Sequence, residues 1–113
     1  MFLDHERLDV YQCALELLRL SLDLLPILAR KRPPLADQLQ RATEGIPLCI
    51  AEGAGKTSER DRARFHAMAR GSAMECAAIL DVVRLLNICD PARVTQGKEL
   101  TVRIVAMLSK MCR

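Results

Sequence analysis

The chain has 113 residues, enough for one compact domain and too few for two, and its 50% hydrophobic and 27% charged residues are typical of a globular protein rather than a disordered tail. Its three aromatic residues, one Tyr and two Phe, are too few for a surface on which nucleic-acid bases stack, as in RRM or OB folds. The formal charge of +3 is uneven: residues 1–57 carry seven basic and eight acidic groups (−1) and residues 58–113 carry ten and six (+4), a bias compatible with a polyanionic partner but too mild to require one.

The first predicted helix, residues 8–29, has two apolar stripes instead of the single one that a monomer needs. Each stripe repeats with spacings of three and four residues, the period of one helix face. One consists of Leu8, Tyr11, Leu15, Leu18, Leu22 and Leu25, and the other of Val10, Cys13, Leu17, Leu20, Leu24 and Ile27. A narrow polar band with Glu16, Arg19 and Asp23 lies between them and also excludes a membrane span. We expect one stripe to face the domain's own core and the other to be covered by a second subunit.

The second predicted helix, residues 35–53, follows a basic segment at residues 30–32 and a pair of prolines that we expect to stop the first helix. The three cations suit the negative end of the first helix's dipole, and a contact with nucleic acid is a second use for them. Pro47, together with Gly45, is expected to kink the second helix, because proline donates no hydrogen bond and its ring crowds the preceding turn.

The third helix is predicted over residues 58–87, with Ser58 as the N-cap and acidic groups in the first turn. Its core stripe is Phe65, Met68, Ser72, Cys76, Ile79, Val83 and Leu86. The middle of this segment is thin, because it is rich in Ala, Gly and Ser. We expect a neighbouring helix to approach it closely there.

The fourth helix is predicted over residues 91–111, with Asp90 as its cap and Pro91 at its first position. Its core stripe is Val94, Gly97, Thr101, Ile104, Leu108 and Met111. No segment shows the sustained alternation of a strand, and the links between helices are short. The sequence therefore predicts an all-α fold, an antiparallel up-down four-helix bundle that forms a single domain over residues 1–113.

The densest group of cations surrounds the start of the third helix. It consists of Lys56, Arg60, Arg62, Arg64 and Arg70. Two interpretations stay open: a surface ion-pair network with the interleaved acidic residues, or a site for the phosphate backbone of a nucleic acid, which would be salt-sensitive and indifferent to base sequence. Residues 55–57 (GKT) resemble the end of a phosphate-binding loop. Position 50 holds Ile50 instead of the required glycine, however, and the segment follows a helix, so we expect no nucleotide hydrolysis.

Glu52 and Glu75 are carboxylates set among apolar or small neighbours, so each is expected to accept hydrogen bonds from a neighbouring helix or to pair with an Arg. We interpret both as structural polar residues, like Ser58 and Ser72, because the polar partners and the cleft that acid–base catalysis needs are not evident. His66 is interpreted as a packed or rim side chain rather than a base. The sequence thus predicts no enzymatic activity and no cofactor.

The five cysteines are an odd number, no two have C-x-x-C spacing, and the two histidines lie far apart, so we expect no metal site. Charged residues interrupt the N-terminal segment where a secretory signal would be apolar. We therefore expect reduced cysteines, packed as small hydrophobic residues, in a cytoplasmic protein.

Four short motifs carry a resemblance to a known family. They are Ile46 to Gly53 (IPLCIAEG), Gly55-Lys56, Arg64-Phe65 and Ala69 to Glu75 (ARGSAME). With the opening Leu8 to Tyr11 (LDVY), they span nearly the whole chain. The chain resembles the bacterial four-helix-bundle proteins encoded within intervening sequences of 23S rRNA genes, relatives of the accessory protein of diversity-generating retroelements.

The resemblance implies a non-catalytic up-down bundle that assembles into a homopentamer. For the retroelement relatives it also implies binding of nucleic acid and of a reverse transcriptase through a basic surface. The chain departs from the family at Cys49, where the family usually has Asn, which puts in doubt any role that rests on that amide.

Two hypotheses follow from the sequence. The first is a non-enzymatic homo-oligomer, pentameric by resemblance, that binds RNA or DNA backbone through the five cations around the third helix. The alternative is a protein-interaction or scaffold module that binds no nucleic acid. Retention on a polyanion as salt is raised distinguishes the two.

Overall fold

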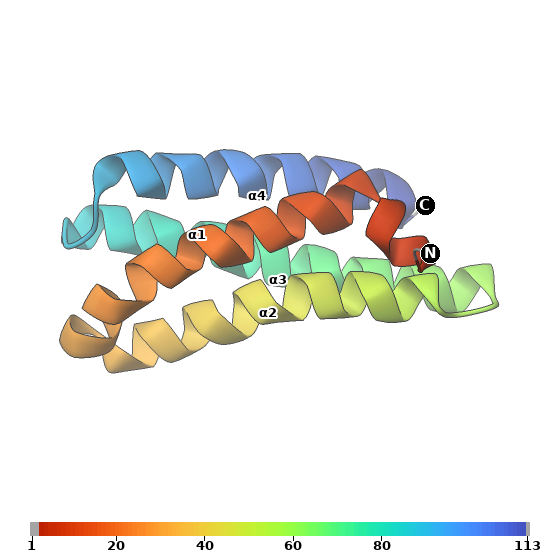
Figure 1. Ribbon diagram of the computed structural model, residues 1–113, viewed down its shortest axis with the longest axis horizontal. Helices are drawn as coiled ribbons and strands as arrows, with labels where there is room; N and C mark the ends of the chain where they lie inside the picture. Colours follow the sequence, from red (N-terminus) through yellow and green to blue (C-terminus); the bar gives the residue numbers. More distant parts are fainter. Residues whose placement is uncertain (1–2, 113) are drawn as a thin grey trace.

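The computed structural model describes residues 3–112, and these fold into four long helices preceded by one short turn of 3-10 helix. The elements are η1 (Asp4–Arg7), α1 (Asp9–Lys31), α2 (Pro33–Ala54), α3 (Glu59–Leu86) and α4 (Pro91–Met111). The described residues contain no strand, so the predicted all-α bundle is confirmed. Each helix contacts its two neighbours in the order α1, α2, α3, α4 and back to α1, and the two ends of the chain lie at the same end of the bundle (Figure 1).

Prolines interrupt the helices less than the sequence suggests. The pair Pro33 and Pro34 does not form a linker but begins α2, because the first turn of a helix needs no amide hydrogen from these positions. Only Arg32 separates α1 from α2. Likewise α1 continues through Pro26 and α2 through Pro47 without ending. The residues expected in a basic linker therefore belong mostly to the last turn of α1.

The core of the bundle uses one of the two stripes of α1, as expected. Val10, Cys13, Leu17, Leu20 and Leu24 are all buried. They pack with apolar residues of the other three helices. The fully buried large side chains from those helices include Leu39, Ile46, Ile50, Leu80, Val83, Val94, Ile104 and Leu108. One continuous core therefore runs the length of the bundle.

The core face of α3 is wider than the predicted stripe. Phe65, Cys76, Ile79 and Val83 are buried as expected, but Met68 is 48% exposed. The buried arc also includes His66, Ala69, Ala73 and Leu80. The reason is geometric: α3 packs against both α2 and α4, so its buried arc spans two seams, and small residues line much of it.

Small residues allow close approach between α2 and α3. A Cβ added at Gly45 would lie 3.3 Å from the Ser72 hydroxyl oxygen, and one at Gly53 would lie 3.1 Å from the Phe65 Cβ. Ala69 and Ala73 are fully buried. The predicted thin middle of α3 therefore does receive a neighbouring helix, although Gly71, in the same segment, faces outward into open space.

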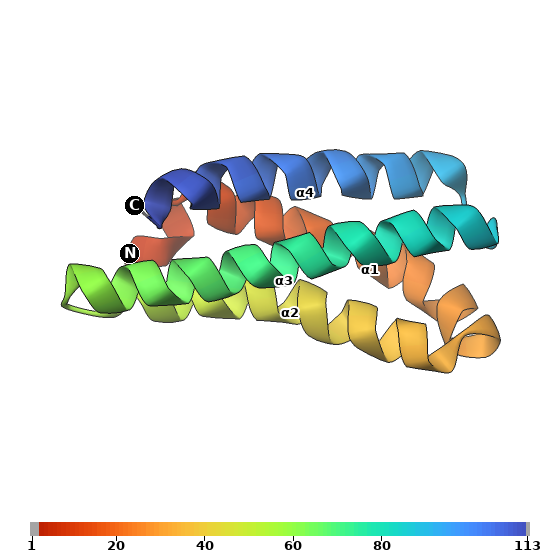
Figure 2. The same cartoon turned by 180° about the vertical axis from the view of Figure 1, so that it is seen from behind.

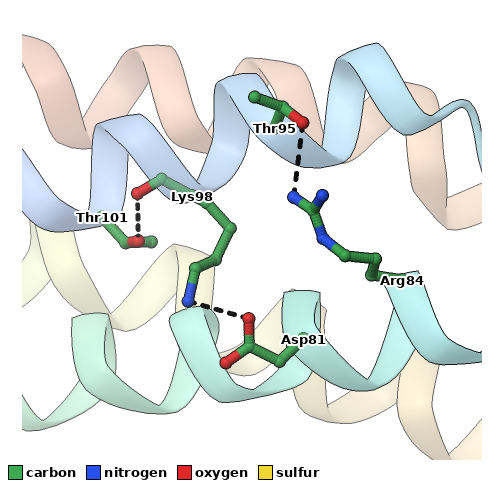
Figure 3. A network of polar contacts seen from close by, with 5 residues as sticks. All are labelled: Asp81, Arg84, Thr95, Lys98 and Thr101. Carbon is green, nitrogen blue, oxygen red and sulfur yellow. Dashed lines mark hydrogen bonds and ion pairs between the residues drawn. The ribbon is translucent and has the colours of Figure 1, made fainter.

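Polar side chains tie α3 to α4 along their outer seam (Figure 3). The Lys98 Nζ lies 2.8 Å from the Asp81 Oδ1, and one turn away the Arg84 guanidinium donates to the Thr95 hydroxyl at 3.3 Å. The Thr101 hydroxyl instead donates to the Lys98 carbonyl oxygen of its own helix at 2.7 Å. Such exposed contacts fix the register of the two helices more than they stabilise the fold.

The helix caps match the sequence prediction. The Ser58 Oγ accepts a hydrogen bond from the Asp61 amide at 3.1 Å, and the Asp90 carboxylate accepts one from the Ala92 amide at 3.0 Å. Asn87 ends α3 in the left-handed region, with φ of 53°. In the described part of the chain, no helix combines the length and apolarity that crossing a membrane requires.

Candidate nucleic-acid interface

The turn between α2 and α3 gathers three cations at one end of the bundle. Lys56 lies in the turn itself, and Arg60 and Arg64 follow on the first turns of α3, with both arginines exposed. The Lys56 Nζ lies 5.1 Å from the centre of the Phe65 ring, and the Arg64 Cζ lies 4.7 Å from it. The electron-rich ring face attracts both cations, so two like charges are held near each other at one place. We call Lys56, Arg60 and Arg64 the basic tip.

The other two predicted cations have structural partners. The Arg62 guanidinium donates hydrogen bonds to the carbonyl oxygens of Lys56 and Thr57, each at 3.0 Å, and so braces the turn between α2 and α3. The Arg70 Nε donates to the Ser109 hydroxyl at 2.8 Å and ties α3 to α4. Both side chains are half-buried. The structure therefore divides the five sequence candidates into the basic tip and two cations engaged in the fold.

Acidic side chains reduce the field of the basic tip without cancelling it. Residues 56–64 contain four basic and two acidic groups, a net charge of +2. The Arg64 Nε and the Asp61 Oδ1 are 4.0 Å apart, with both side chains more than half exposed. An exposed pair at this distance is worth about 0–1 kcal/mol, so a phosphate could displace the carboxylate from the guanidinium.

The second basic group, Arg30, Lys31 and Arg32, lies at the opposite end of the bundle (Figure 1). All three residues are exposed at the junction of α1 and α2. The bundle is 43 Å long along its principal axis. One copy of the chain therefore presents two separate basic ends rather than one continuous surface.

The described part of the structure does not show the hydrogen bonds or Arg pairs that we expected of Glu52 and Glu75. Both side chains are exposed, and neither takes part in a hydrogen bond or an ion pair within residues 3–112. The apolar neighbours in sequence lie on other faces of the helices, so proximity along the chain does not bury these carboxylates. Ser58 is the N-cap of α3, and Ser72 is half-buried against Gly45, so both serines have the structural setting expected of them.

His66 is more buried than its sequence context suggests. Its side chain is 7% exposed, and neither ring nitrogen has a hydrogen-bond partner in the described chain. The ring packs against Gly53, where an added Cβ would lie 3.2 Å from both Cδ2 and Nε2. The glycine of the second helix thus makes room for the imidazole. Only the pairing of Gly53 with His66 across two helices could have indicated this, and that pairing requires the fold.

The five cysteines are free, and Cys13 and Cys76 are buried. Burial, and to a smaller degree the charge of Glu75, raises the pKa of Cys76 from 9.0 to about 12. Burial followed by the charge of Glu52 raises the pKa of Cys49, and burial raises that of Cys89. None of these three thiols is activated as a nucleophile. Between residues 3 and 112, no three His, Cys, Asp or Glu side chains are grouped as metal ligands.

A shallow hollow of about 360 Å³ lies along the seam of α1 and α4. Three acidic and three basic side chains line it together with Gln96 and two leucines. The charged residues are Glu16, Arg19, Asp23, Arg93, Glu99 and Arg103. The Arg93 Nη1 and the Asp23 Oδ2 are 3.3 Å apart across the seam. The charges balance and the charged side chains are exposed, so the hollow provides no desolvated acid, base or nucleophile.

Comparison with known proteins agrees with this fold. The family model described as 23S rRNA-intervening sequence protein matches residues 6–110. A search of curated proteins finds no match. Among solved structures, the chain is similar to a protein of unknown function from the S23 ribosomal protein family of Bacteroides thetaiotaomicron VPI-5482, with a TM-score of 0.84 and 17% identity, over 92% of this chain and 98% of that one. At that identity the likeness shows the fold alone. The family model covers most of the sequence, and the chain therefore belongs to the 23S rRNA-intervening sequence protein family.

Proposed function

We propose that this chain is a non-enzymatic, antiparallel up-down subunit of a homo-oligomer, a homopentamer by family resemblance, that binds the phosphate backbone of RNA or DNA. The observation that carries the proposal is the basic tip: Lys56 and Arg64 lie over one Phe65 ring, and Arg60 projects beside them from the first turn of α3. The turn that presents them is braced by Arg62, so its backbone is already ordered before a ligand binds.

Phosphate is the ligand that this group suits, rather than bases. Phe65 is 8% exposed and its ring is covered by cations, so it offers no face for a base to stack on. Guanidinium and ammonium groups neutralise phosphate charge and release counterions, which gives affinity that depends on salt and not on base sequence. One copy with a net charge of +2 at this end binds weakly, and several copies in one assembly would bind more tightly through multivalency.

The test is binding of labelled single-stranded RNA and of duplex DNA, each at 50 mM and 200 mM salt. If three cations neutralise three phosphates of a duplex, affinity should fall about 40-fold over this range. The variant Lys56→Gln/Arg60→Gln/Arg64→Gln should abolish most of the binding. The matched control has Gln in place of each of the three cations at residues 30–32, at the other end of the bundle. It loses the same charge as the tip variant and should still bind the nucleic acid.

Two outcomes would overturn the proposal. Absence of a shift at 50 mM salt would leave no phosphate-binding activity to explain. Loss of binding in the control with retention in the tip variant would place the contact at the α1–α2 end instead.

The alternative function is a protein-interaction or scaffold module without nucleic-acid binding, and a reverse transcriptase is the partner that the family resemblance suggests. Exposed apolar side chains favour this alternative, among them Leu48 at 68%, Val102 at 64% and Leu85 at 86% exposure. We place either function in the cytoplasm, because five unpaired thiols persist where the solvent is reducing.

A further inference from the structure

The outer stripe of α1 is covered only in part by the bundle. Along it, Tyr11, Leu18 and Leu25 are half-buried, while Leu15 is 37% and Leu22 is 58% exposed. This stripe is the second of the two that the sequence shows; Tyr11 and Leu25 pack against the edge of the core, and Leu15 and Leu22 stay exposed. We call these five residues the α1 face. Its leucines project from the helix as a row of knobs.

A second uncharged surface lies on α3 and α4. It consists of Met74, Ala78, Val82, Leu85 and Val102, which we call the α3–α4 face. Met74 is 51% and Val82 is 43% exposed. Beside Met74, a shallow hollow of about 250 Å³ runs between the two helices, lined by Met74, Ala77, Thr101, Val102, Val105 and Ala106. A hollow between small and apolar residues is the shape that receives a projecting leucine.

The two faces lie on opposite sides of the bundle. In the described structure α1 contacts α2 and α4 but not α3, so α1 and α3 occupy diagonal corners. Figure 1 shows α1 in front and α3 behind it, and Figure 2 shows the reverse. One chain therefore cannot join its own two faces, whereas successive copies can.

The charges of the two sides are complementary. Residues 9–29 and 33–54, which form α1 and α2 without the basic end, carry six acidic and two basic groups, a net charge of −4. Residues 65–86 and 91–111, which form α3 and α4 without the segment that carries the basic tip, carry six basic and three acidic groups, a net charge of +3. Contact of the α1–α2 side with the α3–α4 side of another copy pairs opposite charges. A two-fold contact of either side with itself would pair like charges, which costs affinity.

We propose that copies of this chain associate head to tail, with the α1 face of one copy packed on the α3–α4 face of the next. This rests on the homo-oligomer of the proposed function and adds which two surfaces of the chain meet in it. Such a heterologous interface leaves one α1 face and one α3–α4 face free on any open chain of copies, so a ring is the arrangement that buries them all.

Two single substitutions test the proposal. Leu22→Glu removes the α1 face and leaves the α3–α4 face intact, and Met74→Glu does the opposite. Both positions are about half exposed, so neither change should unfold the monomer. Circular dichroism shows whether each variant keeps its helical content. If Leu22→Glu loses it, Leu15→Glu replaces that variant, and if Met74→Glu loses it, Val102→Glu does. Gln38→Glu, an equally charged change at an exposed position of α2, is the matched control and should keep the wild-type mass.

The expected result is measured as mass by light scattering or sedimentation. Each face variant alone should be a monomer of 12.6 kDa. Mixed together, the two variants retain one intact interface and should form a capped pair of twice that mass, about 25 kDa.

Other masses contradict the head-to-tail interface. If Met74→Glu still dimerises alone, the α1 faces pair with each other, and if Leu22→Glu does so, the α3–α4 faces pair. A mixture that stays at 12.6 kDa, while the wild type associates, overturns the pairing of these two faces but leaves the homo-oligomer of the proposed function standing. A wild type of 12.6 kDa at working concentration overturns both.

Discussion

Replacing His66 by leucine should stabilise the fold. The imidazole is 7% exposed, and neither of its nitrogens has a hydrogen-bond partner among residues 3–112. A neutral imidazole carries one donor and one acceptor, and each buried polar group that lacks a partner costs about 1–3 kcal/mol. Leucine removes both groups and is the better helix former by a few tenths of a kcal/mol.

The packing around His66 limits the gain. An added Cβ at Gly53 would lie 3.2 Å from two ring atoms, so the flat ring fits closely against the backbone of α2. A hydrophobic side chain of similar size but different shape costs up to about 1.5 kcal/mol through imperfect packing. The difference between the two contributions gives a net stabilisation of about 2 kcal/mol for His66→Leu.

Urea unfolding followed by circular dichroism measures this gain. With an m-value of about 2 kcal/mol/M, the midpoint should rise by about 1 M. Protein concentration must be equal in all samples, because association adds to apparent stability. His5→Leu is the control: His5 is half-buried and stacks edge-on against Tyr11 at 4.8 Å between ring centres, so its loss should not stabilise.

A midpoint that falls for His66→Leu would refute the reasoning. The imidazole would then have a partner in the folded assembly that a single chain does not provide. Repeating the measurement on Leu22→Glu, which cannot associate through α1, would show whether a neighbouring copy supplies that partner.

Three further changes probe the caps, the seam and the core. Ser58→Ala should lower the free energy of unfolding by about 1 kcal/mol, because the Asp61 amide loses its acceptor, and Ser58→Asp should restore it. Gly45→Leu should lower the free energy of unfolding by about 1–3 kcal/mol, because the new side chain forces Ser72 away. Gly71→Ala, at an exposed position of α3, should raise it by about 0.5–1 kcal/mol, and equal melting temperatures of the two variants would contradict the close contact of α2 with α3. The pKa of Cys76 is raised from 9.0 to about 12, so the protonated thiol stabilises the fold fully below pH 9, and this contribution is lost as the pH rises toward 12. Between pH 9 and 10.5 the free energy of unfolding measured in urea should fall by about 1.5 kcal/mol more for the wild type than for Cys76→Ala, and parallel profiles would disprove the assignment.

The helices of this chain could be predicted because their signals are local. The two stripes of α1, the hydroxyl cap at Ser58 and the Asp90-Pro91 start each depend on residues within a few positions of one another. Which of the two stripes of α1 faces the core could not be predicted, because both repeat with the same spacing and only the positions of α2 and α4 decide it.

The candidate site could be predicted only in part from the sequence, because hydrogen bonds to other residues determine which cations are engaged in the fold and which form the basic tip. Arg70 looks equivalent to Arg64 in sequence, yet it bonds Ser109, which is 39 positions away. Arg62 turns back onto carbonyl oxygens of the preceding loop, a geometry set by the tightness of the turn. Periodicity likewise places Met68 in the core of α3, and only the packing of α2 on His66 and of α4 on Leu80 shows that these two residues are buried instead.

The lateral faces and the basic tip are directed differently, so the proposed assembly and the proposed phosphate binding use separate surfaces. The α1 and α3–α4 faces lie along the sides of the bundle, whereas Lys56, Arg60 and Arg64 lie at one end. Lateral packing of copies about an axis along the bundle would therefore leave every tip exposed and gather them on one rim. Under the proposed function, residues 56–64 of a single copy, with a net charge of +2, would hold a nucleic acid weakly, whereas a rim of several tips would raise the effective concentration of cations along one strand. If the proposed function and the proposed interface both hold, the apolar second stripe of α1 and the modest charge of each tip serve one purpose: a phosphate contact that is weak in one copy becomes strong enough when copies assemble.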